Sequence, residues 1–251
     1  MPHVKNLTER DFTLGCLWDT LVSMTRGILI AGNNSSLFSA AAAEAAKRVE
    51  SFVSVQIPNH FPMPEGGTVL PPQAETAKGA VPLSWNPASP ISARTLVLTA
   101  ENRLGKINNA VLVCSPPAVF KTADALTPQD IDILVNDEVK GWFLLVRELV
   151  LYFRRLGAGS LSFVAPEISS GGGAKNTPVD LLGPAASASF QAFAQSILAS
   201  TTNEPFQVMG FTGFEAGSEG EFISWLFKVI DEGSGKNSGR WHRYAKLRLF
   251  R

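Results

Sequence analysis

The stretch Gly27-Ile-Leu-Ile-Ala-Gly32, with the polar turn Asn33-Asn-Ser-Ser36 and the alanine-rich segment Ser39–Glu50 behind it, decides the fold. The first run is apolar and ends in glycine, which is typical of a short strand buried on both faces. The alanine-rich segment has high helix propensity. A buried strand, a glycine turn and a helix in this order predict the opening of an α/β domain with a parallel sheet.

The same alternation of apolar runs and helical patterns continues to the end of the chain. The pattern Thr127-Pro-Gln-Asp130 predicts a capped helix start, with an N-cap hydroxyl, a proline at the first helical position and an acid at the third. We predict strands at Phe52–Ile57, Ala80–Trp85, Ala110–Cys114, Ser160–Ala165, Phe206–Phe211 and Ala245–Phe250, and helices at Ile91–Leu104, Glu138–Leu156, Ala185–Ser200 and Glu221–Ile230. The predicted fold class is α/β, a Rossmann-like three-layer sandwich with a doubly wound parallel sheet.

The predicted domain organisation is an N-terminal extension, residues 1–26, and one Rossmann-like domain, residues 27–251. The extension carries an apolar helical face that must be buried on its own domain or on another subunit. Residues 58–90 are proline-rich and form either a loop insertion or a partner-binding arm. Residues 169–178 form either a substrate loop or a surface connection. The apolar face of the extension consists of Leu14, Leu17, Trp18, Leu21 and Val22.

Composition excludes several classes of protein. The 251 residues are 45% hydrophobic and 18% charged, which excludes a disordered chain. Lys and Arg equal Asp and Glu at 22 each, so the zero net charge predicts no attraction to nucleic acid or to an anionic membrane. Two cysteines and three scattered histidines exclude a disulfide framework and argue against a metal site. No targeting or membrane segment is visible, so we expect a cytoplasmic protein.

Four segments, in this order and at nearly this spacing, carry a likeness to a known family. They resemble the glycine-rich turn, the fourth strand, the start of the long interface helix, and the fifth strand with its active-site helix of the short-chain dehydrogenases/reductases. These segments are Ile28–Phe38, Gly105–Pro116, Leu126–Phe143, and Gly159–Pro166 together with Pro184–Ala188. The resemblance covers residues 27–250 and implies a Rossmann fold and NAD(P)-dependent oxidoreductase relatives.

The resemblance also implies a catalytic tetrad, which this sequence lacks. In the family a tyrosine moves the proton, a lysine four residues later lowers its pKa, a serine polarises the carbonyl and an asparagine supports a water. The two tyrosines, Tyr152 and Tyr244, are followed four residues later by leucine and arginine, so no Tyr-x-x-x-Lys exists. The family positions fall on Pro184 for the tyrosine, Ala188 for the lysine, Ala165 or Pro166 for the serine and Glu138 for the asparagine. We therefore assign no catalytic residue.

The cofactor turn departs from the family pattern as well. Its three glycine positions are Gly32, Ser36 and Phe38, and the phenylalanine would crowd a pyrophosphate unless its ring turns away. The second strand offers Gln56 and then Ile57 and Pro58, with no acid placed for a ribose and no arginine for a 2′-phosphate. Backbone N–H groups and polar side chains at a helix N-terminus still suit an anion. The candidate cofactor-binding residues are Gly32, Asn33, Asn34, Ser35 and Ser36, and the cofactor stays open between NAD, NADP and none.

Other residues have two interpretations each. Glu138 is either a substitute acid or base, or an exposed acid in the first turn of a helix. Cys114, at the carboxyl end of a strand, is either a reactive thiol or a buried structural cysteine, and the second is favoured. Tyr152 is expected to pack in the core or in an interface. The basic segment Arg240–Arg248 forms a solvated or subunit-contact strand rather than a nucleic-acid site.

These observations leave two hypotheses for function. The first is a non-catalytic member of the family that acts as a binding or structural subunit. The second is an NAD(P)-dependent oxidoreductase that uses non-standard catalytic residues. In either case helices 138–156 and 185–200, apolar or rich in small residues, predict a homodimer or homotetramer.

Overall fold

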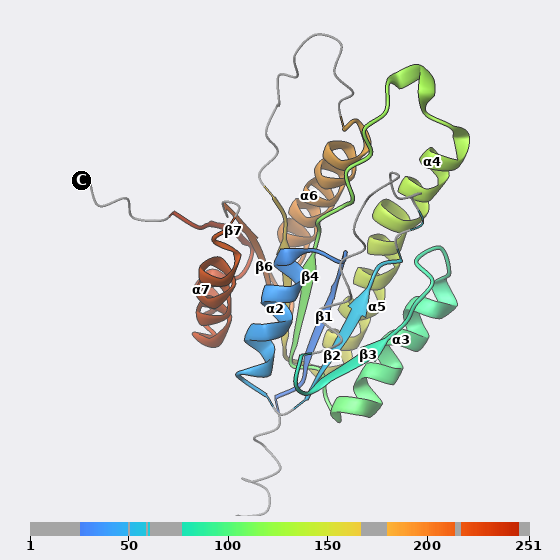
Figure 1. Ribbon diagram of the computed structural model, residues 1–251. Helices are drawn as coiled ribbons and strands as arrows, with labels where there is room; N and C mark the ends of the chain where they lie inside the picture. The colour runs from blue at the N-terminus through green and yellow to red at the C-terminus, as the bar shows by residue number, and fades with distance from the viewer. Residues whose placement is uncertain are drawn as a thin grey trace, which may run out of the picture.

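One parallel sheet organises the part of the chain that the structure describes. The computed structural model describes residues 26–49, 51–58, 60, 77–166, 180–213 and 217–245. Within them the strands are β1 (Ile28–Gly32), β2 (Phe52–Gln56), β3 (Ala80–Leu83), β4 (Asn109–Val113), β5 (Ser160–Val164), β6 (Gln207–Thr212) and β7 (Arg240–Arg243). Their order is β3-β2-β1-β4-β5-β6-β7, with every neighbouring pair parallel (Figure 1). The order reverses between β1 and β4, which makes the sheet doubly wound and confirms the predicted fold class.

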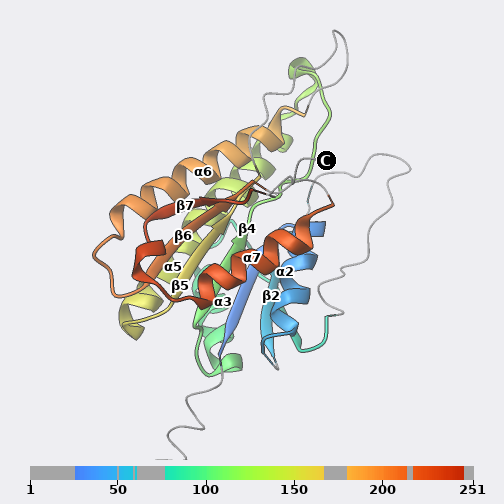
Figure 2. The same cartoon turned by 90° about the vertical axis from the view of Figure 1, so that its left-hand side faces the viewer.

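Helices cover both faces of the sheet and make the three layers (Figures 1 and 2). The helices α3, α5 and α6 pack on one face, and α2 and α7 pack on the other. Their bounds are α2 (Ser36–Ala46), α3 (Pro90–Leu104), α4 (Pro128–Ile133), α5 (Gly141–Leu156), α6 (Leu182–Ser200) and α7 (Glu219–Asp231), with single turns η1 (Ala123–Ala125) and η3 (Gly235–Asn237). Within these described ranges no helix is long and apolar enough to cross a membrane.

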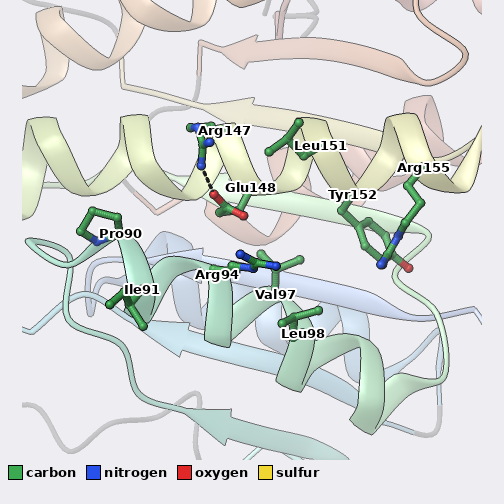
Figure 3. A pocket seen from close by; sticks show the side chains of 10 residues that line it. All are labelled: Pro90, Ile91, Arg94, Val97, Leu98, Arg147, Glu148, Leu151, Tyr152 and Arg155. Atoms are coloured by element: carbon green, nitrogen blue, oxygen red, sulfur yellow. Dashed lines mark hydrogen bonds and ion pairs between the residues drawn. The ribbon is translucent and has the colours of Figure 1, made fainter.

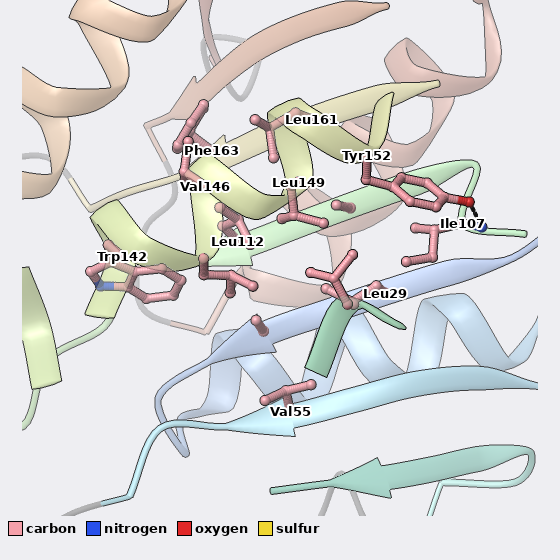
Figure 4. Packing of buried hydrophobic residues seen from close by; sticks show 14 of the residues in the cluster. Leu29, Val55, Ile107, Leu112, Trp142, Val146, Leu149, Tyr152, Leu161 and Phe163 are labelled. Carbon is pink, nitrogen blue, oxygen red and sulfur yellow. Dashed lines mark hydrogen bonds between the residues drawn. The ribbon is translucent and has the colours of Figure 1, made fainter. Parts of the chain in front are cut away.

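The core lies in two layers because each central strand is apolar on both sides. On the first face Trp142, Val146 and Leu149 of α5 pack over Leu112 and Leu161 of the sheet (Figure 4). On the second face the aromatic rings of α2 and α7 cover the alternate residues of β1, β4 and β6. The residues at the centre of this second layer are Ile30, Phe38, Val111, Phe211, Phe222 and Phe227. A sheet buried on both faces is what near-continuous apolar strands require.

The helix predicted at Glu138–Leu156 begins ten residues earlier than expected. Thr127 and Asp130 form the predicted capping box, in which each side chain bonds the other residue's backbone N–H. The helix then runs from Pro128 through α4, the π-helical turn η2 (Leu134–Lys140) and α5. In η2 the N–H of Gly141 bonds to the carbonyl of Asn136, five residues back, so the turn holds one extra residue. Glu138 therefore lies in the middle of a continuous helical segment and does not start one.

The last strand also differs from its prediction. The sequence predicts a last strand at Ala245–Phe250 and a basic strand at Arg240–Arg248, and the strand that pairs with β6 is Arg240–Arg243, inside the second range. Ala245 lies outside the strand, and residues 246–250 lie outside the described residues. The two end residues of β7 are exposed and its two central residues are half-buried, so this edge strand needs little apolar character. The other predicted elements are confirmed in type and place, with ends that shift by a few residues.

Three sequence predictions lie largely outside the described residues. They are the N-terminal extension up to residue 25, the greater part of the insertion at 58–90, and the loop at 169–178. Within the insertion, β3 confirms the short strand predicted at Ala80–Trp85. The division into extension, domain and insertion otherwise stays a prediction.

Candidate functional site at the carboxyl edge of the sheet

The predicted site residues converge where β1, β4 and β5 end. Asn33 follows β1, Cys114 and Ser115 follow β4, and Pro166 lies just beyond β5. Because all strands are parallel, these ends lie at one edge of the sheet, and the strand order reverses between β1 and β4. Such a switch point is where open α/β sheets bind ligands. The π-helical turn η2 brings Glu138 to the same place.

Gly32 is a glycine because three groups crowd its Cα. A Cβ there would lie 2.6 Å from the carbonyl oxygen of Val113 and 3.0 Å from the ring of Phe38. Phe38 is fully buried in the layer formed by α2 and α7, so its ring turns away from the edge. The close approach of β1 to β4 and this ring together exclude a side chain at position 32.

The N-terminus of α2 is occupied by groups of this chain. Ser35 is the N-cap, and its hydroxyl accepts the backbone N–H of Phe38 at 3.2 Å. The Ser36 hydroxyl donates to Glu219 of α7 at 3.1 Å. Asn34 is exposed beside them. A phosphate held at Ser36 would therefore lie against a carboxylate, which opposes the attraction of the helix N-terminus.

Asn33 points into the protein and joins three segments. Its Oδ1 accepts the backbone N–H of Ser115 at 3.0 Å, which fixes the amide orientation because a backbone N–H can only donate. Its Nδ2 then donates to Oε1 of Glu138 at 2.6 Å. The first turn, the loop after β4 and the π-helical turn are thus held by one buried amide.

Glu138 is 2% exposed, so the expectation of an exposed first-turn acid is wrong. The physical reason is the earlier helix start, which places this residue in η2 and turns it toward Asn33. Burial, with a smaller contribution from the Asp137 carboxylate, raises the pKa of Glu138 to about 7, although the hydrogen bond from Asn33 acts to lower it. At neutral pH this side chain is present in both protonation states.

The sequence analysis did not identify all of the polar groups that surround Glu138. Asp137 is buried and lies 2.7 Å from Nδ1 of His60, whose ring is exposed. The thiol of Cys114 is fully buried, and burial together with the charge of Glu138 raises its pKa well above the usual value. The Ser187 hydroxyl of α6 bonds to that thiol. A protonated thiol is a poor nucleophile, so the structural interpretation of Cys114 is confirmed as a buried residue.

Comparison with solved structures identifies this architecture. The chain is similar to an NADH-dependent reductase, A1-R′, complexed with NAD (13% identity, 87% of this chain and 94% of that one, TM-score 0.64). It is similar to a short-chain dehydrogenase from Mycobacterium smegmatis (13% identity, 90% and 95%, TM-score 0.67). It is also similar to one from Bacillus anthracis (11% identity, 90% and 99%, TM-score 0.69). The chain has the short-chain dehydrogenase/reductase fold. No family model and no curated protein matches the sequence.

Two of the catalytic positions of the short-chain dehydrogenase/reductase family lie on the exterior of α6. Pro184 and Ala188, at the tyrosine and lysine positions, are both exposed and have no side-chain donor. Pro166, at the serine position, is half-buried and contributes only its carbonyl oxygen, which accepts the Gln191 amide at 2.6 Å. Of the four positions, only Glu138 presents an ionisable group to the edge of the sheet.

The described residues do not fit a dinucleotide in the family's manner. Asn33 is committed to Glu138 and Ser115, and Ser36 to Glu219. At the end of β2 a cavity of about 260 Å³ offers the amide of Gln56 and hydroxyls, but its lining holds no acid for a ribose and no arginine. Within the described ranges no group of three or more His, Cys, Asp or Glu side chains could hold a metal ion.

Proposed function

We propose that this chain is a non-catalytic protein with the short-chain dehydrogenase/reductase fold, acting as a binding or structural subunit. The observation that carries the proposal is the bond between Asn33 and Glu138. It directs the first polar side chain of the cofactor turn inward, at a site whose tyrosine and lysine positions are proline and alanine. A positioned proton donor is typically worth about 10²–10⁴-fold in rate, and the chain has no Tyr-x-x-x-Lys to supply one.

Titration with dinucleotides tests this proposal. NAD, NADH, NADP and NADPH are added separately while the unfolding temperature is measured. A ligand present at about 100 times its Kd would stabilise the fold by about 2.7 kcal/mol, which for a chain of this size is a rise of about 5–10 °C. We expect no rise with any of the four. A rise of that size with one of them, followed by hydride transfer to a ketone or aldehyde, would contradict the proposal.

One observation favours the second candidate, an oxidoreductase with non-standard residues. Glu138 is buried at the edge of the sheet with its pKa near 7, which is the range in which a general acid or base works best at neutral pH. If reductase or dehydrogenase turnover is found, Glu138→Gln distinguishes the candidates. The second candidate requires that the variant lose turnover and the corresponding limb of the pH–rate profile. Retained turnover would assign the activity to other residues.

We further propose that the protein is a homodimer or homotetramer through α5 and α6, in the cytoplasm, without nucleic acid or membrane partners. Fewer apolar residues of α5 are free to make this contact than the sequence indicated, because most of them face the core. Phe143 remains 45% exposed and contacts Phe193 of α6, with ring centroids 4.1 Å apart and planes tilted by 39°, which joins the outer faces of the two helices. The exposed small residues of α6 include Ala185, Ala188, Ala192, Ser196 and Ala199.

A further inference from the structure

A groove of about 470 Å³ lies between α3 and α5, on the outer side of these helices (Figure 3). Three of the apolar side chains that line it are open to solvent: Ile91 is 79% exposed, Leu98 43% and Leu151 45%. Large apolar side chains gathered in one exposed groove are typical of a surface that binds a partner. None of the lining residues belongs to the candidate site at the edge of the sheet or to the contact of Phe143 with Phe193.

The charge that the groove presents to solvent is positive. Arg147 pairs with Glu148, and the arginine side chain is 65% exposed while that of the glutamate is 12% exposed. Eight residues further along α5, Arg155 pairs with Glu101 at 2.7 Å, and the side-chain exposures are 60% and 29%. In each pair the guanidinium therefore reaches solvent and the carboxylate is largely covered. Exposed ion pairs contribute only about 0–1 kcal/mol, so an incoming acid can share either arginine at little cost.

Arg94 adds a third cation in the middle of the groove. Ile91, Arg94 and Leu98 share one face of α3, since they are three and four residues apart, and the arginine extends over the apolar floor (Figure 3). Arg94 has no ion-pair partner within the part of the chain that the structure describes. A guanidinium binds a carboxylate through two parallel hydrogen bonds, so an acid is the group that best matches it.

The shape of the groove fits a helix better than a small molecule. At the rise of an α-helix, Ile91 and Leu98 are about 10 Å apart along α3, and Arg147 and Arg155 are about 12 Å apart along α5. Sites for small molecules bury roughly 70–90% of the ligand, whereas this groove is open along the side of Ile91. A groove between two helices is a common seat for an amphipathic helix, which lays its apolar face into it. An apolar stripe of about two to three turns, bordered by acids, matches both the length and the charge.

We propose that the groove between α3 and α5 docks an amphipathic helix of a partner protein, one whose apolar stripe is bordered by acidic residues. The stripe packs against Ile91, Leu98 and Leu151, and an acid near its centre binds Arg94. Acids at its two ends bind the exposed guanidiniums of Arg147 and Arg155. The proposal gives a partner to the binding role proposed above and rests on that role, but it uses no residue of the cofactor turn.

Selection from a displayed peptide library, with the full chain as the target, tests the proposal. Each peptide is designed as a helix of about four turns with leucine at its apolar positions, and its border positions vary among glutamate, glutamine and lysine. We expect the selected peptides to carry glutamate at the borders and to bind Leu98→Glu at least about tenfold more weakly than the native chain. Phe120→Glu is the matched control, because Phe120 is 66% exposed outside the groove, and it should leave the affinity unchanged.

Reversing the charge of Arg94 tests whether an acid is recognised at the centre of the groove. Arg94→Glu should bind the selected acidic peptide at least about tenfold more weakly, and a peptide with lysine at the central border position should regain affinity for this variant. Arg103→Glu reverses another exposed arginine of α3 that does not line the groove, and it should change neither affinity.

Several outcomes would overturn the proposal. They are selection of no peptide, selection of basic peptides as readily as acidic ones, and equal binding to the native chain and to Leu98→Glu. If no peptide is selected and Leu98→Glu dissociates an oligomer, a second copy covers the groove; if dodecanoate binds there and no peptide does, the ligand is a small amphiphile. Hydride transfer with a dinucleotide while peptide binding persists would contradict the non-catalytic role and leave the docking site intact.

Discussion

At the scale of the residue, Glu138 determines how stability depends on pH. Its pKa is about 7 in the folded protein and close to the ordinary glutamate value of 4.5 when unfolded. Between these values the unfolded chain binds fewer protons, so the free energy of unfolding falls as pH rises from about 4.5 to 7. The full effect is roughly 3 kcal/mol, and it is absent below pH 4.5. Glu138→Gln keeps an acceptor for Asn33 and should remove this dependence.

Urea unfolding of both proteins between pH 4.5 and 8 measures the effect. The glutamine variant should come closest to the native protein at pH 4.5 and exceed it most in stability at pH 8. Glu232→Gln is the control, because that side chain is exposed after α7 and bonds only weakly, at 3.5 Å, to Asn237. Stability curves that stay parallel for Glu138→Gln and the native chain would show that Glu138 ionises as freely in the folded state as in the unfolded one.

Tyr152 is a structural tyrosine whose hydroxyl serves the backbone. It accepts the N–H of Ile107 in the core, at 2.8 Å. Tyr152→Phe keeps the ring and leaves that buried N–H without an acceptor, which should cost about 1–3 kcal/mol in the free energy of unfolding. Tyr244→Phe is the matched control, since its hydroxyl has no hydrogen-bond partner within the described ranges, and it should change stability little. Equal losses in chemical denaturation would refute the assignment.

At the scale of the element, two helical glycines should respond oppositely to the same change. A Cβ at Gly141 would lie 2.6 Å from Cβ of Pro87, whereas at Gly220 in α7 nothing lies within 4 Å. Gly141→Ala should therefore destabilise the protein by about 1–3 kcal/mol through overpacking. Gly220→Ala should stabilise it by about 0.4–1 kcal/mol, because alanine loses less entropy on folding. Thermal unfolding of both variants gives the two signs, and a shared sign would contradict the packing at Pro87.

The elements that could be predicted are those whose signal is local. The central strands are short apolar runs such as Ala110–Val113. The capping box at Thr127 is formed by residues within four consecutive positions. The basic segment Arg240–Arg248 was predicted as a strand, but its pairing with β6 could not be predicted, because neither the apolar pattern nor the charge of β7 indicates a sheet partner. The π-helical turn could not be predicted from composition, since one extra residue in a helix does not change the helix propensity of the segment.

The sequence could predict where the candidate site lies but not how its side chains are arranged. Parallel strands must end at one edge, so the meeting of Asn33, Cys114 and Glu138 follows from topology. The orientation of Asn33 and the burial of Glu138 depend on the extra residue in η2, which rotates everything before α5. The pair of His60 and Asp137 joins residues 77 positions apart, and only the folded chain brings them together.

At the scale of the whole molecule, the prediction concerns self-association. Light scattering or sedimentation at micromolar concentration should give a multiple of 26.9 kDa. Ala192→Arg on the exposed side of α6 should dissociate the assembly, because an arginine prevents the close approach that small residues permit. Ala43→Arg, exposed on α2 in the opposite layer, is the control and should leave it intact. A monomeric native protein would refute the assembly, and an oligomer that tolerates Ala192→Arg would move its interface elsewhere.

Because of the π-helical turn, a very small genetic change is enough to break the contact between the buried Glu138 and Asn33. Deleting the codon for the exposed Lys140 would turn the bond between Gly141 and Asn136 into an ordinary α-helical one, with α5 still seated on the sheet. Everything before the deletion would rotate by about 100°, the angle of one helical residue. Glu138 would move away from Asn33, and the Nδ2 group of Asn33 would lose its carboxylate acceptor. A single in-frame deletion therefore separates a chain in which Glu138 holds the Asn33 side chain from one in which it does not.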